Sequence, residues 1–211
     1  MQTPNLSNPT PRNPDRQLSP QKTAAILNGA MQEFLARGYA AASMDRIAAA
    51  ASVSKATVYS HFHDKQALFN ALIEQLVEKK FRTIFGTSDM HVLEGNPNIV
   101  LRQLANRMLD AGMNDPQFLD FMRLLVGESG RFPELARTFV RNIEATTFKA
   151  LVEYLKTCKK DLKLVDTEAT ARIFVGALVH YTKIQKMLHG ADILPMERDR
   201  LIDNIMLAIV R

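Results

Sequence analysis

A short polar segment, residues 52 to 69, gathers side chains that could act together. Its sequence, SVSKATVYSHFHDKQALF, combines hydroxyl, lysine, tyrosine and histidine side chains between two segments of helical apolar periodicity. Hydroxyl, phenol and ammonium groups donate hydrogen bonds to phosphates and to base edges. His61 and His63 are close together, but no third metal ligand lies near them in the sequence. The segment therefore indicates an anionic partner rather than a metal site.

Catalytic and cofactor-binding motifs are absent from the sequence. It contains no nucleophile elbow, P-loop, dinucleotide-binding glycine pattern or zinc-protease motif. GESG at 127–130 lacks the elbow spacing, and His91, His180 and His189 are isolated. Cys158 is the single cysteine, so no intramolecular disulfide can form. We expect no enzyme activity, no cofactor and no metal.

Helices with clear start signals surround the polar segment. Apolar residues repeat at helical spacing from about residue 21 until Gly38, which is placed to stop that helix. N-cap residues then precede three more predicted helices, over about 44–51 after Ser43, 55–62 after Ser54 and 65–85 after Asp64. Two short helices joined by a three-residue turn match the helix-turn-helix unit, whose second helix lies in the DNA major groove.

Projecting the second of these short helices onto a wheel separates the roles of its residues. Val58 and Phe62 fall on one side, where they would anchor the helix to its neighbours. The opposite side carries Ala56, Thr57 and Ser60, small residues that permit close approach to base edges. From the wheel alone, the solvated face of an ordinary small bundle is an equally good interpretation.

The remaining polar side chains of this region lie where they would meet phosphates. Tyr59 and His61 flank the small face, and Lys55 in the first turn could bond a phosphate or a guanine edge. Ser43 and Lys65 stand at the starts of neighbouring helices, where free backbone N–H groups favour an anion. The net charge of +5 permits such a partner without requiring one.

The rest of the chain continues the helical periodicity without strand-like alternation. Further helices are predicted from about Pro97 to Gly112, over about 118–126, up to about residue 160, over about 167–188 and over about 196–210. The fold class is therefore all-α, with about nine helices. Residues 1–20 are rich in proline and polar side chains and poor in apolar ones, which predicts a disordered arm.

The segment GYAAASMDRIAAAASVSKATVYSHFHDKQALF carries a family pattern. Through it, residues 21–76 resemble the N-terminal domain of TetR-family transcriptional regulators, and residues 123–139 resemble the C-terminal domain of the AefR-like branch. Two residues depart from the family pattern: Ala56 stands where it often has Gly, and Ser43 where it often has Thr. Because of Ala56, the resemblance does not predict the operator sequence. The resemblance implies DNA-contacting roles for Ser43, Ser54, Lys55, Ala56, Thr57, Tyr59, Ser60, His61 and Lys65.

The helix predicted over 167–188 is apolar nearly all round, so it needs cover on more than one side. TetR-like proteins pair their last two helices across a two-fold axis, and the resemblance therefore implies a homodimer. A buried central helix of a monomer is the alternative. The implied interface residues are Phe174, Leu178, Tyr181, Ile202, Ile205, Met206 and Ile209.

A ligand pocket in the larger domain is also implied by the resemblance. Methionine and aromatic side chains there are adaptable and suit a small-molecule site. At helical spacing the same side chains also suit a plain core, which is the alternative. The candidates are Met108, Phe118, Phe121, Met122, Phe148 and Tyr181, with Met113 and Phe139 in the same apolar set.

Composition indicates an arm (1–20), and the resemblance implies a DNA-binding domain (21–66, the head) and a ligand-binding and dimerisation domain (67–211, the body). The expected function is a homodimeric repressor, released from a palindromic operator on double-stranded DNA by an unknown small-molecule effector. A constitutive regulator, an activator without a ligand and a helical protein–protein adaptor are the alternatives. No apolar run could span a bilayer and no signal peptide is evident, so we expect a cytoplasmic protein with no membrane partner.

Overall fold

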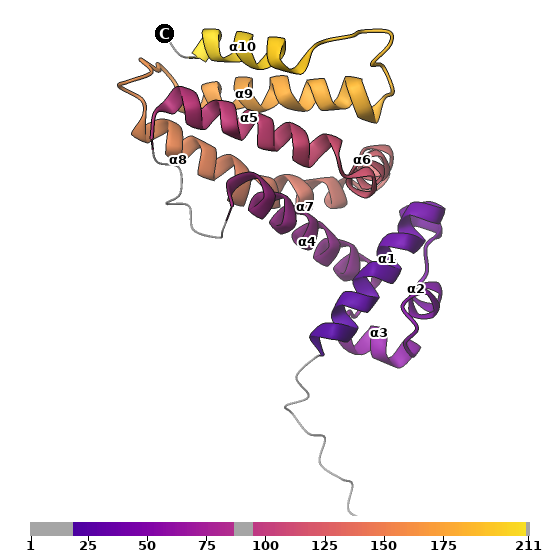
Figure 1. The fold of residues 1–211 in the computed structure, drawn as a ribbon. Helices are drawn as coiled ribbons and strands as arrows, with labels where there is room; N and C mark the ends of the chain where they lie inside the picture. Colours follow the sequence, from indigo (N-terminus) through magenta and orange to yellow (C-terminus); the bar gives the residue numbers. More distant parts are fainter. Residues whose placement is uncertain (1–18, 87–94, 210–211) are drawn as a thin grey trace, which may run out of the picture.

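The structure is a computed structural model that describes residues 19–86 and 95–209 (Figure 1). The α-helices in these ranges are α1 (Pro20–Ala41), α2 (Met44–Ala50), α3 (Lys55–His61), α4 (Lys65–Phe85), α5 (Pro97–Met113), α6 (Pro116–Glu128), α7 (Pro133–Ile143), α8 (Lys149–Thr157), α9 (Thr167–Thr182) and α10 (Arg198–Ile209). Two π-helical segments, η2 (Glu144–Phe148) and η3 (Lys183–Met187), join α7 to α8 and extend α9. With α7, η2 and α8 counted as one continuous helix, and η3 as the end of α9, the described ranges contain nine helices and no strand. This confirms the predicted all-α class.

The helices of the head begin at the predicted caps. Ser43 Oγ accepts from the Arg46 amide at 3.4 Å, Ser54 Oγ from the Thr57 amide at 3.1 Å, and Asp64 Oδ1 from the Ala67 amide at 2.7 Å. Gly38 has φ of 76° and ψ of 165°, so it breaks the helical backbone near the end of α1 as predicted. Nearly all of the predicted arm, residues 1–18, lies outside the described residues, as does residue 210 at the end of the last predicted helix.

Two buried clusters form the interior, and α4 takes part in both. The first packs α1, α2, α3 and the first part of α4 against α6 and α7. Within it the ring of Phe69 in α4 stacks on that of Phe121 in α6, with centroids 5.2 Å apart. The second packs the end of α4, at Ile84 and Phe85, against α5, α8, α9 and α10. The domain boundary near residue 66 stays a prediction, because the core of the head continues into α6 and α7.

The arrangement of the layers follows from this double role of α4. In Figure 1, α4 leads obliquely from the head into the body, where α5, α8, α9 and α10 lie in layers with α10 farthest from the head. Within the described ranges, no helix is both long and apolar enough to cross a bilayer. The same part of the chain holds no group of three His, Cys, Asp or Glu side chains placed to bind a metal ion.

Candidate nucleic-acid interface

Helix α3 is fixed to the head by one side and open on the other. Val58 is fully buried, with 0% of its surface exposed, and Val53 and Phe62 are partly buried against the same cluster. The opposite side of α3 exposes Ala56, Ser60 and the Tyr59 ring. Packing therefore separates Val58 and Phe62 from Ala56 and Ser60 as the helical wheel predicts, whereas Thr57, predicted on the open side, is half-buried.

The hydroxyl groups of α3 already make local hydrogen bonds. The Oγ atoms of Ser54 and Thr57 lie 2.8 Å apart, and Ser60 Oγ donates to the Thr57 carbonyl at 2.8 Å. A serine hydroxyl has one donor and two acceptor lone pairs. While this bond holds, Ser60 therefore offers an acceptor to the exposed side of the helix, the match for an amino group on a base edge.

Lys55 is an exposed cation at the start of α3. Its Nζ lies 2.7 and 3.1 Å from the carboxylate oxygens of Asp45 in α2, and 5.9 Å from the centre of the Tyr59 ring. The hydrogen bond from Lys55 to Asp45 raises the pKa of the ammonium, so Lys55 is charged at neutral pH. Ion pairs between exposed side chains contribute little to stability, and a phosphate can compete with this one.

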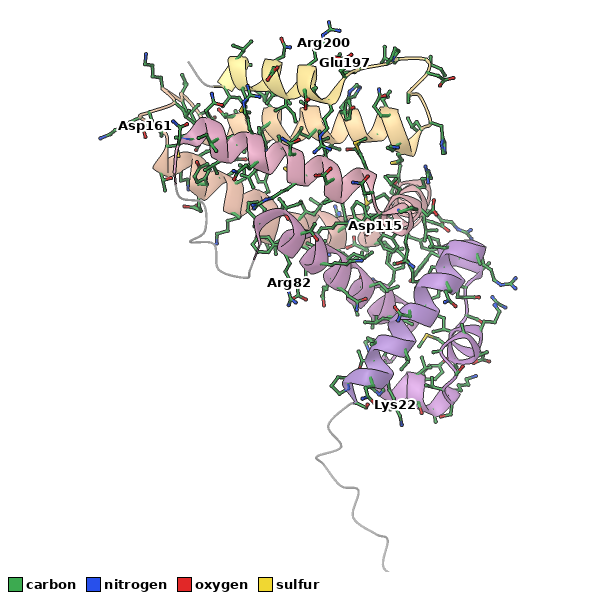
Figure 2. The ribbon with its side chains drawn as sticks, in the orientation of Figure 1. Lys22, Arg82, Asp115, Asp161, Glu197 and Arg200 are labelled. Carbon is green, nitrogen blue, oxygen red and sulfur yellow. The ribbon has the colours of Figure 1, made fainter. Side chains whose placement is uncertain are left out.

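The start of α1 contributes to the same end of the head. Thr23 Oγ1 lies 2.9 Å from His61 Nδ1, which ties the first turn of α1 to the last turn of α3. Figure 2 shows Lys22 at this end of the head, beside α3, and its side chain is exposed. Sequence reasoning did not include Lys22, because nothing in the sequence shows that this helix start lies next to α3.

Lys65 has a different environment from the one predicted. Its Nζ donates to the carbonyl oxygens of Tyr39, Ala40 and Ala42 at 2.7, 3.0 and 3.1 Å, and lies 4.6 Å from the centre of the Tyr39 ring. Burial lowers the pKa of this ammonium. An ammonium has three donors, and all three are used here. A phosphate contact by Lys65 stays a prediction, and it requires one carbonyl to be exchanged for a phosphate oxygen.

An ion pair between a buried carboxylate and a half-exposed arginine, which the sequence did not reveal, positions α2. The carboxylate of Glu33 in α1 is 8% exposed, and Arg46 Nε of α2 lies 2.5 Å from it. Arg46 also donates to the carbonyl of Ala41, and Arg37 lies 3.5 Å from the same carboxylate. The pair holds α2 against α1, and the four residues 51–54 that join α2 to α3, one more than predicted, then set where α3 lies.

Comparison with known proteins decides the family. The model for bacterial regulatory proteins of the tetR family matches residues 26–72, and the model for the C-terminal domain of AefR-like transcriptional repressors matches residues 99–210, which is more than half of the chain. The chain belongs to the TetR family. It is a DNA-binding transcriptional regulator, and neither this family nor this fold is that of an enzyme.

Individual relatives agree with this assignment. The solved structure of the flavonoid-responsive regulator FrrA is 30% identical, with a TM-score of 0.70, and the match covers 89% of this chain and 92% of that one. The uncharacterized HTH-type transcriptional regulator YvkB of Bacillus subtilis is 26% identical over 85% of this chain and 90% of its own length. The HTH-type transcriptional activator FasR of Mycolicibacterium smegmatis is 40% identical over 58 residues, 28% of this chain and 26% of its own length.

The predicted ligand-pocket residues of this TetR-family chain are divided between the two cores. Phe121 is fully buried in the first cluster, where Met122 and Phe139 pack. Met108, Met113, Phe148 and Tyr181 belong to the second cluster, and Lys80 Nζ lies 4.3 Å from the centre of the Phe118 ring. Two surface clefts in the described ranges have volumes of about 640 and 430 Å³, and none of these residues lines either of them. A pocket formed by them stays a prediction.

The predicted dimer residues face the interior of their own subunit. All seven are at most 8% exposed in the single chain, so a partner helix would meet the opposite face of α9 and α10 instead. That outer face exposes Ile173, Val179 and Leu207. Periodicity marks these helices as apolar, but it does not tell which apolar side chains the subunit itself covers. Dimerisation through this helix pair stays a prediction.

Proposed function

We propose that this TetR-family regulator is a homodimeric repressor that acts in the cytoplasm and leaves its operator when a small molecule binds. The observation that supports DNA binding most directly is the division of α3 between a buried anchor, Val58, and an exposed face of small residues. A helix held by one side and open on the other can enter the major groove without losing its packing.

The contacts in this proposal fall into two classes. Ala56, Thr57 and Ser60 face the base edges, where a methyl group and hydroxyl acceptors can distinguish one base pair from another. The side chains around these three residues contact the phosphates, and such contacts position the helix without reading the base sequence. These are Lys22, Ser43, Ser54, Lys55, Tyr59, His61 and Lys65.

A dimer is proposed because one head is too small to specify a long DNA sequence by itself. Two heads spaced about 34–36 Å apart read the two halves of a palindrome that one head could not specify. The outer face of α9 and α10 supports this part of the proposal, since Ile173 is 62%, Val179 55% and Leu207 76% exposed. Gly176 has open space where a side chain would stand, which permits a partner helix to approach closely.

Repression and effector release are supported by the relatives. The C-terminal model that matches is that of a repressor domain, and the relative FrrA is named as flavonoid-responsive. In the proposed mechanism a small molecule binds the body, at the predicted pocket residues, and favours an orientation of α4 that misplaces the heads. It acts only through its difference in affinity for the two orientations.

An activator is the second candidate, because the relative FasR, which matches over the head, is named as an activator. A transcriptional reporter under the upstream region of the gene separates the two candidates. Deleting the gene raises reporter output if the chain represses and lowers it if the chain activates.

Binding of the purified chain to the DNA upstream of its own gene tests the proposal. Fluorescence anisotropy should show specific binding that weakens steeply with added salt, because phosphate contacts release counterions. Equal affinity for this DNA and for a shuffled sequence of the same composition would contradict it.

A further inference from the structure

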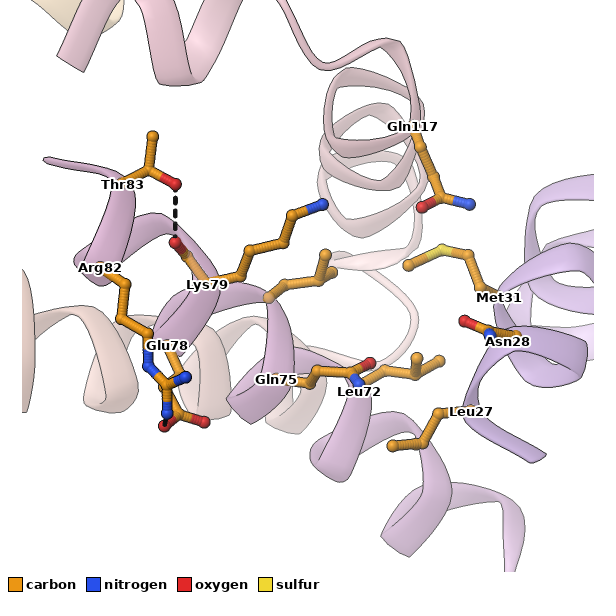
Figure 3. A pocket seen from close by; sticks show the side chains of 11 residues that line it. Leu27, Asn28, Met31, Leu72, Gln75, Glu78, Lys79, Arg82, Thr83 and Gln117 are labelled. Carbon is orange, nitrogen blue, oxygen red and sulfur yellow. Dashed lines mark hydrogen bonds and ion pairs between the residues drawn. The ribbon is translucent and has the colours of Figure 1, made fainter. Parts of the chain in front are cut away.

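A cleft of about 640 Å³ lies at the junction of the head and the body (Figure 3). It is bounded by α1 of the head, by the middle of α4 and by Gln117 at the start of α6. Its volume falls within the range of about 300–1,000 Å³ typical of small-molecule sites. None of the pocket residues predicted from the sequence takes part in it.

The floor of this junction cleft is apolar. Leu27 and Met31 come from α1, and Leu72 and Leu76 come from α4. Each pair is four residues apart, so each helix turns one continuous face toward the cleft. The four side chains are between 1% and 7% exposed, so the protein covers most of their surface, and an apolar ligand group would contact the small part that stays open to the cleft.

The rim of the junction cleft is polar, and its side chains can form hydrogen bonds to a ligand. Asn28, Gln75 and Gln117 line it, and within the described ranges their carboxamides make no hydrogen bond to another protein group. Lys79 extends from α4 across the cleft toward Gln117 (Figure 3). Its side chain is 65% exposed. Three carboxamides, the cations of Lys79 and Arg82 and the carboxylate of Glu78 therefore surround an apolar floor.

The charge of Lys79 is not matched closely by the protein. Its Nζ lies 3.7 Å from Asp115, whose carboxylate is held by Lys80 at 3.0 Å and accepts from the Phe118 amide at 3.1 Å. The other cation at the rim, Arg82, is paired with Glu78 on its own helix. An anionic ligand could therefore pair with Lys79 while disrupting a weaker ion pair than it would by pairing with Arg82.

We propose that the junction cleft binds an amphipathic small molecule that carries a carboxylate. Its apolar part lies on the leucine and methionine floor, and its carboxylate meets Lys79 and the carboxamide donors. Because α1 belongs to the head and α6 to the body, the ligand contacts both, and its binding is coupled to DNA affinity. This coupling rests on the DNA-binding function proposed above, and the site is distinct from the predicted pocket within the body.

Calorimetric titration of the full chain with decanoate and with decanol tests the ligand class. Decanoate should bind, and Lys79→Gln should weaken it about fivefold while leaving decanol unchanged. Lys156→Gln is the matched control, since Lys156 is also exposed and also lies near a carboxylate, that of Glu153 on α8. If Lys79→Gln and Lys156→Gln have the same effect on decanoate, the proposed role of the cation is wrong.

A variant that fills the junction cleft tests the site. Gln75 is exposed, so Gln75→Trp adds volume to the cleft without entering the core, and an unchanged Tm shows that the chain still folds. Decanoate should change the Kd for upstream DNA at least about threefold in the wild type, and Gln75→Trp should abolish both its binding and this effect. No binding to the wild type, unchanged binding to Gln75→Trp, or binding without an effect on DNA overturns the proposal. Specific DNA binding without decanoate tests the proposed function separately.

Discussion

Lys55 and Lys65 begin neighbouring helices of the head, yet their side chains are available to a ligand to different degrees. Lys55 is exposed and paired with an equally exposed carboxylate, that of Asp45. Lys65 donates to three backbone carbonyls. The two lysines are alike in the sequence, and only their neighbours separate a cation open to phosphate from one that holds the end of α1.

Lys55→Ala should weaken DNA binding by a similar factor on every sequence. Losing one phosphate contact lowers the slope of log K against log salt by about 1. Anisotropy titrations at several salt concentrations measure this slope. Lys160→Ala, an exposed lysine beyond α8, is the control and should leave the slope unchanged. An unchanged slope for Lys55→Ala would remove this residue from the interface.

Ser60→Ala should change which sequence is preferred rather than how salt-dependent binding is. The hydroxyl offers an acceptor on the exposed side of α3, and a lost base contact is worth about 1–3 kcal/mol of discrimination. A panel of operator variants, each with one base pair changed, gives the preference at each position. If the variant shows the wild-type preference at every position, Ser60 does not read a base.

At the scale of elements, the position of α3 depends on how α2 is attached to α1. The buried carboxylate of Glu33 binds Arg46 at 2.5 Å and Arg37 at the longer distance of 3.5 Å. Only the first of these ion pairs connects two helices, since Arg37 lies on α1 with Glu33. The loss of Arg46 would leave a buried charge with its weaker partner alone.

Arg46→Ala should therefore lower the free energy of unfolding by about 1–3 kcal/mol, the usual penalty for a buried polar group left without its partner. Arg37→Ala removes the same kind of side chain from the same carboxylate and should cost no more than about 0.5 kcal/mol. Urea denaturation compares the two variants with the wild type. Equal losses would show that the contact between α1 and α2 is not what stabilises the head.

At the scale of the whole molecule, α4, α5 and α6 meet at one corner around Asp115 (Figure 2). Lys80 of α4 bonds the Asp115 carboxylate and the carbonyl of Ala111, and it is mostly buried there. Burial alone would raise the pKa of the Asp115 carboxyl, but hydrogen bonds from Lys80 and the Phe118 amide hold it below its ordinary value. This corner ties α4 to the end of α5 and to the turn that precedes α6.

Asp115→Asn should destabilise the chain in a pH-dependent way. The pKa of this carboxyl is lower in the folded chain than in the unfolded chain, where it is about 3.9. The ionised carboxylate therefore stabilises the fold at pH values above the unfolded-state pKa. This stabilisation is lost as the pH falls through the folded-state pKa. Near pH 7 the variant should lose about 1–2 kcal/mol, since asparagine keeps the cap but not the charge. The difference should shrink below about pH 4. Asp161→Asn, at an exposed turn, should match the wild type in urea denaturation at each pH.

Ile173→Glu should shift a dimer toward monomer. It places a charge among the exposed apolar side chains of the outer face of α9 and α10, where a partner helix would have to cover it. Val140→Glu makes the same kind of change at a side chain of nearly equal exposure, 60% against 62%, on α7. Analytical ultracentrifugation over a range of concentrations distinguishes them. If neither variant alters the molecular mass, the dimer does not form through this face.

The sequence by itself determined the order of the helices, the caps of the head and the division of α3 into an anchored and an open side. These features depend on neighbours a few residues apart, so periodicity and cap residues such as Ser54 and Asp64 suffice to predict them. The family pattern also lies within one continuous segment, and the family models confirm it.

Only the tertiary structure decided which of two faces a helix buries and which distant groups meet. Phe174 and Ile202 are as apolar in sequence as Ile173 and Leu207, but the first two fill the core of their own subunit and the last two are exposed. The donors of Lys65 and the junction cleft between α1, α4 and α6 likewise depend on contacts across many residues. Packing of whole helix faces sets these contacts, and local spacing carries no information about them.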